Sequence, residues 1–243
     1  MRAATERWAV LLTAGLMVVG AGSPVDESLD GLVAANTAAR GGADAIEGVH
    51  SLRIEVRIEE PSFTVDAIYR ASRDGSMRID VYDGDGRRVY TEALESGRAW
   101  SQAAGDNAPV EPTGVEGTAA LRHGVESPLK LFGLHEMTRR GHTLEFRGRE
   151  VVDGIDYYVV QAVLDDGYET CYYLNPVTML VERERQDRAL HVDADPQPHW
   201  IETRFEDYRP VDGVLFPFRQ VECRLDTGEV LATTTTRRIV VNP

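Results

Sequence analysis

The chain has 243 residues and a formal net charge of −14, because 40 Asp and Glu residues outnumber 26 Lys and Arg residues. This acidity excludes the basic stripe by which proteins bind nucleic acid, and it excludes adhesion to an anionic membrane surface by charge alone. The length suits a single domain, since all-β domains often reach about 200–250 residues as one unit.

The first 22 residues have the order of a secretory signal peptide. Arg2 and Arg7 give a positively charged start, the run from Trp8 to Val19 is uncharged and mostly apolar, and small residues follow at 20–23. A retained anchor is the alternative, but the apolar run is short for a membrane span. We therefore predict cleavage after Ala21 or Gly22, and a soluble mature chain, residues 23–243, in the periplasm or cell envelope.

A helix is predicted from Asp26 to Gly48, because Leu29, Leu32 and Val33 begin an apolar stripe. Gly41-Gly42 should kink or break it, since each glycine costs about 1 kcal/mol in a helix interior. Alternation with period two then predicts strands separated by short turns. Their ranges are 50–60, 63–71, 77–81, 88–94, 98–102, 142–152, 157–164, 169–174, 179–186, 200–208, 214–225 and 230–241.

Two further segments interrupt this series of strands. Residues 103–117 are rich in Gly, Pro and Ala without a period, and they are predicted to be a loop. Short helical passages follow from Thr118 to Arg140. Hairpin links favour an antiparallel sheet, and so wide a sheet must curl. The predicted fold is mainly β (α+β): a curled, unclosed half-barrel of about eleven antiparallel strands, with an N-terminal helix and a helical lid on its concave side.

Motifs for catalysis and for cofactors are absent from the sequence. It has no G-x-S-x-G nucleophile elbow and no glycine-rich phosphate loop. His135-Glu136 begins like a zinc-protease motif, but the next histidine, His142, stands seven residues on instead of four. His191, Asp193, Asp195 and His199 share a polar loop, for which a solvated loop is favoured over a metal site. We therefore predict no enzyme, no metal and no cofactor.

The two cysteines, Cys171 and Cys223, lie in separate predicted strands. Export would permit a disulfide between them. Two buried free thiols are the alternative, because cysteine often behaves as a small core residue, and the sequence does not give the Cα separation that a disulfide needs.

Three segments resemble the LolA/LolB-like superfamily of bacterial lipoprotein carriers. Residues 39–43 through Ser51-Leu52 look like the first helix of that family entering its first strand, and residues 174–180 look like a late hairpin. Residues 205–217, Phe-Glu-Asp-Tyr-Arg-Pro-Val-Asp-Gly-Val-Leu-Phe-Pro, are similar to a hairpin common in outer-membrane lipoprotein-sorting relatives. The resemblance covers nearly all of the mature chain. It implies an open β-barrel covered by a helical lid, as a single lipid- or lipoprotein-binding domain.

Apolar side chains of the helical insertion and of the first strands are the candidate ligand-binding residues. An open barrel mouth is a common site for apolar ligands, and the alternative is that the same residues plug the barrel as core. They are Leu121, Val125, Leu129, Leu131, Phe132, Leu134 and Met137 in the lid, and Leu52, Ile54, Val56, Phe63, Val65, Tyr69 and Ile79 in the sheet.

The predicted function is a monomeric periplasmic carrier for an acylated or otherwise apolar ligand, in lipoprotein or lipid trafficking to the outer membrane. The expected partners are lipid or lipoprotein acyl chains and a membrane-anchored protein, with no nucleic acid. The alternative is an envelope sensor or regulatory interaction module on the same fold, resembling the RseB-type stress regulators.

Overall fold

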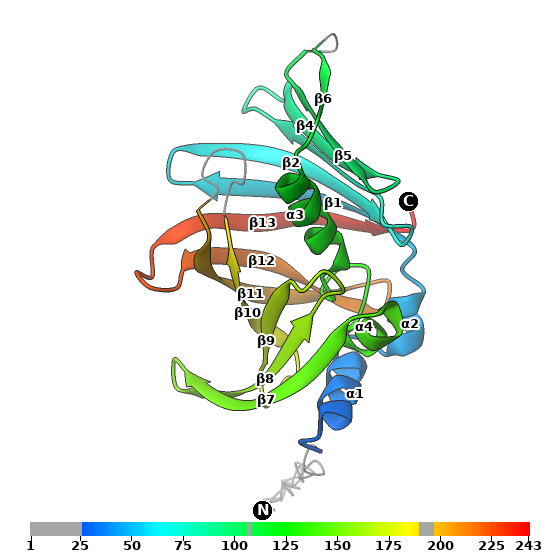
Figure 1. The fold of residues 1–243 in the computed structure, drawn as a ribbon, viewed down its shortest axis with the longest axis vertical. Coiled ribbons are helices and arrows are strands. Elements are labelled where there is room, and N and C mark those ends of the chain that lie inside the picture. Colours follow the sequence, from blue (N-terminus) through cyan, green and yellow to red (C-terminus); the bar gives the residue numbers. More distant parts are fainter. Residues whose placement is uncertain (1–25, 106–107, 190–196) are drawn as a thin grey trace, which may run out of the picture.

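The computed structural model describes residues 26–105, 108–189 and 197–243, which form a single antiparallel sheet with short helices on one side (Figure 1). Within these residues the sheet has thirteen strands in the order β6-β5-β4-β3-β2-β1-β13-β12-β11-β10-β9-β8-β7. The strands are β1 (Ser51–Glu60), β2 (Phe63–Ser72), β3 (Met77–Tyr82), β4 (Arg88–Glu95), β5 (Arg98–Ala103), β6 (Val110–Pro112), β7 (Thr143–Val152), β8 (Ile155–Val163), β9 (Glu169–Leu174), β10 (Val181–Arg188), β11 (His199–Val211), β12 (Val214–Arg224) and β13 (Val230–Val241).

The mainly β class and the unclosed antiparallel sheet are confirmed, but the strand count was too low. Twelve of the thirteen strands overlap the predicted strand ranges, and the other one, β6, lies inside the segment 103–117 that we expected to be a loop. It pairs with β5 through only three residue pairs. A strand of three residues has too few side chains to show a period, so the sequence pattern did not reveal it.

The predicted N-terminal helix is present and is broken at the predicted place. It consists of α1 (Leu29–Ala39) and α2 (Ala43–Glu47). The side-chain oxygen of Ser28 accepts a hydrogen bond from the Gly31 amide at 3.1 Å, which caps α1. Gly41 and Gly42 have φ angles of 125° and 94°, and glycine is the residue that adopts this region of φ without steric cost. The chain therefore turns sharply between the two helices.

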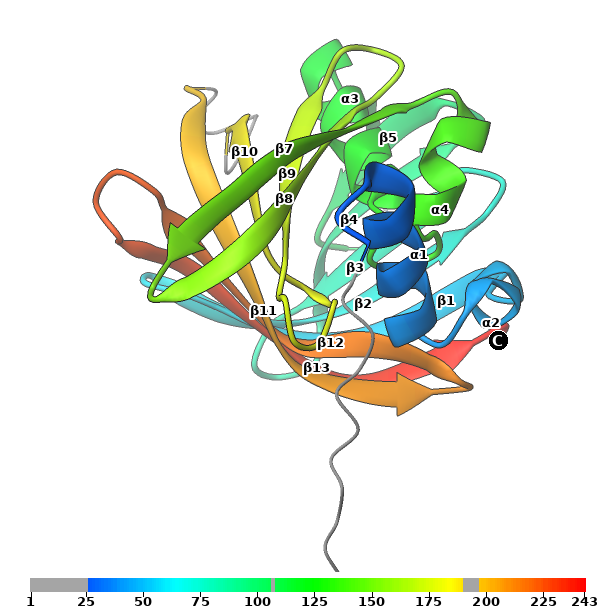
Figure 2. The same cartoon turned by 90° about the horizontal axis from the view of Figure 1, so that it is seen from below.

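The sheet curves around the helices. Figure 2 shows β7, β8 and β9 arching on one side of α1, with β1, β12 and β13 on the other. The helical insertion comprises α3 (Val115–Glu126), α4 (Leu134–Met137) and a 3-10 turn, η1 (Thr138–Arg140). In Figure 1, α3 lies across the inner face of the sheet in front of β1. The edge strands β6 and β7 do not pair with each other, so the sheet stays open.

Two apolar clusters fill the space between the sheet and the helices. The larger one joins Ile46 of α2 and Phe132 of the helical insertion to β1, β2, β12 and β13. The second joins Leu32 of α1 and Met137 of α4 to β8, β9 and β10. Burial of apolar surface is the main stabilising contribution to the folding of such a domain. Side chains of α1, α2 and α4 are therefore part of the core.

Two segments of the family resemblance meet in space at Gly41. A Cβ atom on Gly41 would overlap the carbonyl oxygen of Gly213 in the turn between β11 and β12. The Leu215 amide also donates to the Arg40 carbonyl at 2.8 Å. The side chain of Arg40 is fully buried and donates through Nη1 to the carbonyl oxygens of Pro128 and Phe132. One short stretch thus joins α1, the β11–β12 hairpin and the helical insertion.

The disulfide alternative is wrong, because Cys171 and Cys223 are free and lie far apart in the sheet. Cys171 on β9 is opposite Arg185, Arg185 is opposite Glu202, and Glu202 is opposite Cys223 on β12. Three strand spacings of roughly 4.8 Å separate the two cysteines, and a disulfide requires Cα atoms within about 7 Å. The structure has two free thiols, of which Cys223 is buried and Cys171 is half-buried.

Residues 1–22, the predicted signal peptide, lie outside the described residues. Among the residues that are described, no helix has both the length and the apolar character to cross a membrane.

Candidate functional site

A cavity of about 690 Å³ lies between the inner face of the sheet and α3. Its volume falls within the range of about 300–1,000 Å³ that is typical of small-molecule sites. One wall is apolar and comes from β1, β2 and β3. Five of the predicted binding residues line the cavity: Ile54, Val56, Tyr69 and Ile79 on this wall, and Leu129 in the helical insertion. Ile58, Phe216 and Ile239 extend the same apolar surface.

The other predicted binding residues do not line this cavity. Phe63 is 43% exposed at the first residue of β2, beside the β1–β2 turn, and Val65 is half-buried. The remaining residues pack in the two apolar clusters, as the core alternative predicts; they are Leu52, Leu121, Val125, Leu131, Phe132, Leu134 and Met137. Phe132 is only 4% exposed. The insertion therefore has a packed base, and only its α3 side faces the cavity.

The opposite wall of the cavity is polar and was missed by the sequence analysis. On this wall Glu222, Thr203, Glu184 and Tyr172 stand directly opposite one another across β12, β11, β10 and β9. Opposed residues in antiparallel strands point to the same face, so these side chains form one row. A signal was present in β10, whose sequence Val-Glu-Arg-Glu-Arg-Gln-Asp-Arg puts charges on both faces. A strand covered on both faces rarely has that composition unless the charges have partners.

Glu184 is the most perturbed carboxyl group of this row. Burial raises its pKa from 4.5 to about 7, and repulsion from Glu222 adds to the rise, whereas Arg188 and Lys130 oppose it. The amide of Gln186 donates to its Oε1 atom at 3.1 Å. Glu222 itself forms an ion pair with Arg188 at 2.8 Å. A carboxyl group that is half protonated near neutral pH in a cavity is a common mark of a functional site.

Lys130, the single lysine of the chain, also lines the cavity. Its ammonium group lies 4.7 Å from the ring centroid of Tyr69, a cation–π arrangement. Burial lowers the pKa of Lys130, and the charges of Glu184 and Glu222 oppose that effect. The hydroxyl group of Tyr69 is buried and has no hydrogen-bond partner in the described structure. Two side chains that carry hydrogen-bond donors thus lie next to each other in the cavity, and the Tyr69 hydroxyl group has no acceptor in the described structure.

The N-terminal and middle parts of α3 are held mainly by surface contacts. Among its residues only Gly117 and Val125 are buried. Arg122 forms an ion pair with Asp165, and His123 contacts Asp166 at 2.8 Å, both in the turn between β8 and β9. The His123 ring also stacks on Tyr168 with centroids 3.8 Å apart. Exposed pairs of this kind contribute about 0–1 kcal/mol each, so α3 is weakly fastened over the cavity.

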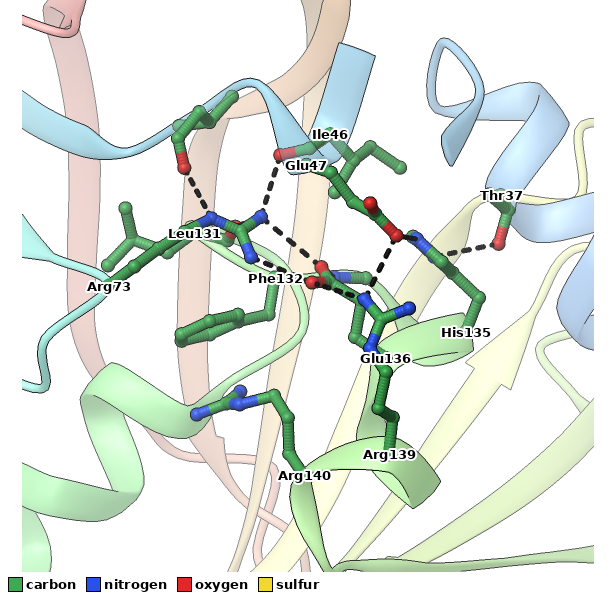
Figure 3. Close-up of polar contacts among 12 residues, drawn as sticks. Thr37, Ile46, Glu47, Arg73, Leu131, Phe132, His135, Glu136, Arg139 and Arg140 are labelled. Carbon is green, nitrogen blue, oxygen red and sulfur yellow. Dashed lines mark hydrogen bonds and ion pairs between the residues drawn. The ribbon is translucent and has the colours of Figure 1, made fainter. Parts of the chain in front are cut away.

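The base of the insertion is fastened much more firmly, by Arg73 (Figure 3). Its guanidinium group forms an ion pair with Glu136 at 2.7 Å and donates to the carbonyl oxygens of Val49, Ile46 and Leu131. Phe132 lies between Arg73, at 4.8 Å from its ring centroid, and Arg140, at 3.2 Å. Hydrogen bonds from Arg73 to three carbonyl oxygens, its ion pair with Glu136 and the covered Phe132 ring therefore fix this end of the insertion.

The histidines and acidic groups do not assemble a metal site in the part of the chain that the structure describes. His135 lies 3.2 Å from the Thr37 hydroxyl group and 3.5 Å from Glu47 (Figure 3). Its neighbour Glu136 is engaged by Arg73. Both members of the zinc-protease-like pair therefore contact other side chains of the protein. His191, Asp193 and Asp195 lie outside the described residues.

Three solved structures share this architecture. A LolA superfamily protein from Nitrosomonas europaea matches with a TM-score of 0.52 and 11% identity, covering 82% of this chain and 91% of that one. The chain has a LolA-like fold. A DUF1329 family protein from Desulfovibrio piger matches this LolA-like chain with a TM-score of 0.53 and 15% identity, over 90% and 93% of the two chains.

The third structure is a putative outer membrane lipoprotein-sorting protein domain from Vibrio parahaemolyticus, with a TM-score of 0.50 and 11% identity over 87% and 91% of the chains. No family model matches the sequence, and no curated protein matches it. The resemblance first seen in the motifs is therefore confirmed at the level of the fold.

Proposed function

We propose that this LolA-like chain is an exported binding protein that carries an acylated or otherwise apolar ligand through the cell envelope. The observation that supports the proposal is the cavity of about 690 Å³ with its apolar wall on β1 to β3. The signal-peptide pattern at residues 1–22 supports the envelope location. In this proposal the protein is not an enzyme, and α3 is the element that moves to admit the ligand.

The energetics suit a carrier that both loads and releases. Burial of an acyl chain gains about 0.8 kcal/mol per CH₂ group relative to water, and a membrane offers a similar gain. Net transfer between membrane and cavity is therefore near thermodynamic balance. A cavity closed by a weakly held helix such as α3 keeps the barrier to exchange low.

Transfer of a fluorescent acyl lipid between phosphatidylcholine vesicles tests the proposal. The mature protein should accelerate transfer, and Ala119→Trp, which places a bulky ring on the α3 wall of the cavity, should abolish the acceleration. Ala103→Trp, at an exposed site at the end of β5, is the matched control and should leave transfer unchanged. Absence of acceleration by the wild-type protein would contradict the carrier function and would favour the alternative of a regulatory interaction module.

A further inference from the structure

The polar end of the cavity has a balanced set of charges. Of the cavity-lining charged residues, Glu116 and Asp187 are exposed, while Glu126 is engaged by Arg140 and His142. The remaining four, Lys130, Glu184, Arg188 and Glu222, are two bases and two acids, and their charges balance when Glu184 is ionised. A ligand with a net charge would disturb this balance, and an uncompensated charge away from water is costly.

The same region offers hydrogen-bond donors that lack acceptors. Tyr69 is 9% exposed, and its hydroxyl group has no hydrogen-bond partner in the described structure. The Lys130 ammonium group has three donors, of which one reaches the Gly124 carbonyl oxygen at 3.4 Å. The Lys130 ammonium group lies over the Tyr69 ring, and both side chains line the cavity. A carbonyl oxygen placed there would accept from both.

From these two observations we infer that the cavity selects uncharged amphiphiles whose head group contains an ester or amide carbonyl, with Lys130 and Tyr69 donating to that carbonyl and the acyl chain lying along β1 to β3. The inference rests on the proposed function, since it names the ligand class for the same cavity. The row of Glu222, Thr203 and Glu184 then faces the hydroxyl or amide groups of the head group, for which carboxylates are good acceptors.

Three probes with the same 18-carbon chain separate the alternatives: monoolein is neutral, oleate is anionic and oleylamine is cationic. Binding to the mature protein is measured at pH 7.5 by calorimetry, at probe concentrations below micelle formation. Because Lys130 is the single lysine, its reductive methylation by formaldehyde and borohydride can be followed by peptide mass spectrometry without interference from other lysines. We expect monoolein to bind at least tenfold more tightly than either ion and to protect Lys130 from methylation.

Two charge-removing variants test whether the four-charge balance sets this selectivity. Lys130→Met leaves two acids and one base, so the affinity for oleylamine should rise relative to that for monoolein. Glu184→Gln leaves two bases and one acid, so the affinity for oleate should rise instead. Arg87→Met, at an exposed turn between β3 and β4, is the control and should change neither ratio. A purely structural role of Lys130 or Glu184 would not produce opposite shifts.

The possible failures are distinct from one another. Equal affinities for the three probes, tighter binding of an ion, or binding of monoolein without protection of Lys130 would overturn the inference and leave the carrier function intact. Failure of every probe to bind would remove the carrier function, and the inference with it.

Tyr69→Phe should weaken monoolein binding severalfold, because it removes a donor to the carbonyl oxygen and no charge.

Discussion

The guanidinium group of Arg73, just after β2, forms a 2.7 Å ion pair with Glu136 of α4, although the two residues are 63 positions apart in the sequence. The Glu136 side chain is 2% exposed, and its carboxylate also accepts from the Gly133 amide at 3.0 Å. Burial alone would raise the pKa of Glu136, but the hydrogen bonds from Arg73 and the Gly133 amide outweigh burial and lower it. This pair fixes the base of the helical insertion to the sheet.

Arg73→Ala should therefore destabilise the fold by about 3–5 kcal/mol, because it leaves the buried Glu136 carboxylate without its main partner. It also leaves three carbonyl oxygens without their donor. The free energy of unfolding from urea denaturation measures the effect. Arg87→Ala, in an exposed turn, should change it by less than about 0.5 kcal/mol. Equal effects of the two substitutions would contradict the anchoring role of Arg73.

Phe132→Ala should lower stability by about 3–5 kcal/mol, the usual cost of removing a large ring from a packed core. The ring is 4% exposed and lies between Arg73 and Arg140. Ile79→Ala, on the half-buried cavity wall, should cost less, because its side chain already faces open space. Thermal unfolding of both variants gives the comparison. A larger loss for Ile79→Ala would mean that Phe132 faces the cavity after all.

The stability of the protein should respond to pH through Glu184. Its folded pKa is about 7 and its ordinary value is 4.5, so between these pH values the folded state binds a proton that the unfolded state has lost. The contribution of Glu184 to the free energy of unfolding therefore falls as pH rises through this window. Glu184→Gln should be the more stable protein at pH 8, by about 2 kcal/mol, and the difference should vanish below pH 4.5.

The charges around Glu184 set that response. Lys130, Arg188 on β10 and Glu222 on β12 act on its carboxyl group, and Thr203 on β11 and Tyr172 on β9 stand opposite it. Asp85→Asn, in an exposed turn, is the control, because its carboxylate lies in solvent. A stability difference between wild type and Glu184→Gln that does not change from pH 4.5 to pH 8 would contradict the raised pKa.

Asp166→Asn should speed uptake of a ligand into the cavity. The substitution removes the carboxylate that contacts His123 at 2.8 Å and so weakens the hold of the β8–β9 turn on α3. A loss of about 1 kcal/mol would raise the open fraction about fivefold. Stopped-flow uptake of a fluorescent acyl probe measures the rate. Glu145→Gln, which breaks the exposed pair with Arg147 on β7, should leave uptake unchanged.

Both cysteines should titrate as thiols. Denatured, unreduced protein is expected to give two free thiols per chain with a thiol reagent, since Cys171 and Cys223 are separated by β10 and β11. Buried Cys223 should react only after denaturation. A count of zero would require a strand order different from the one described.

The sequence by itself determined the local features of this protein. Period-two alternation located nearly every strand, and Gly41-Gly42 marked the break between α1 and α2. The motif at residues 205–217 pointed to the fold, because hairpins and helix breaks depend on neighbouring residues and leave a local pattern. The same reasoning gave the apolar wall at Ile54, Val56, Tyr69 and Ile79.

Only the tertiary structure decided which of the buried apolar residues also line the cavity. Phe132 and Leu129 are each 4% exposed, yet Phe132 is covered by two guanidinium groups and Leu129 lines the cavity. The row of Glu184, Thr203 and Glu222 likewise comes from three strands whose register no local pattern encodes. Long-range pairing places these groups together, and burial then shifts their pKa values, so the polar end of the cavity exists only in the folded chain.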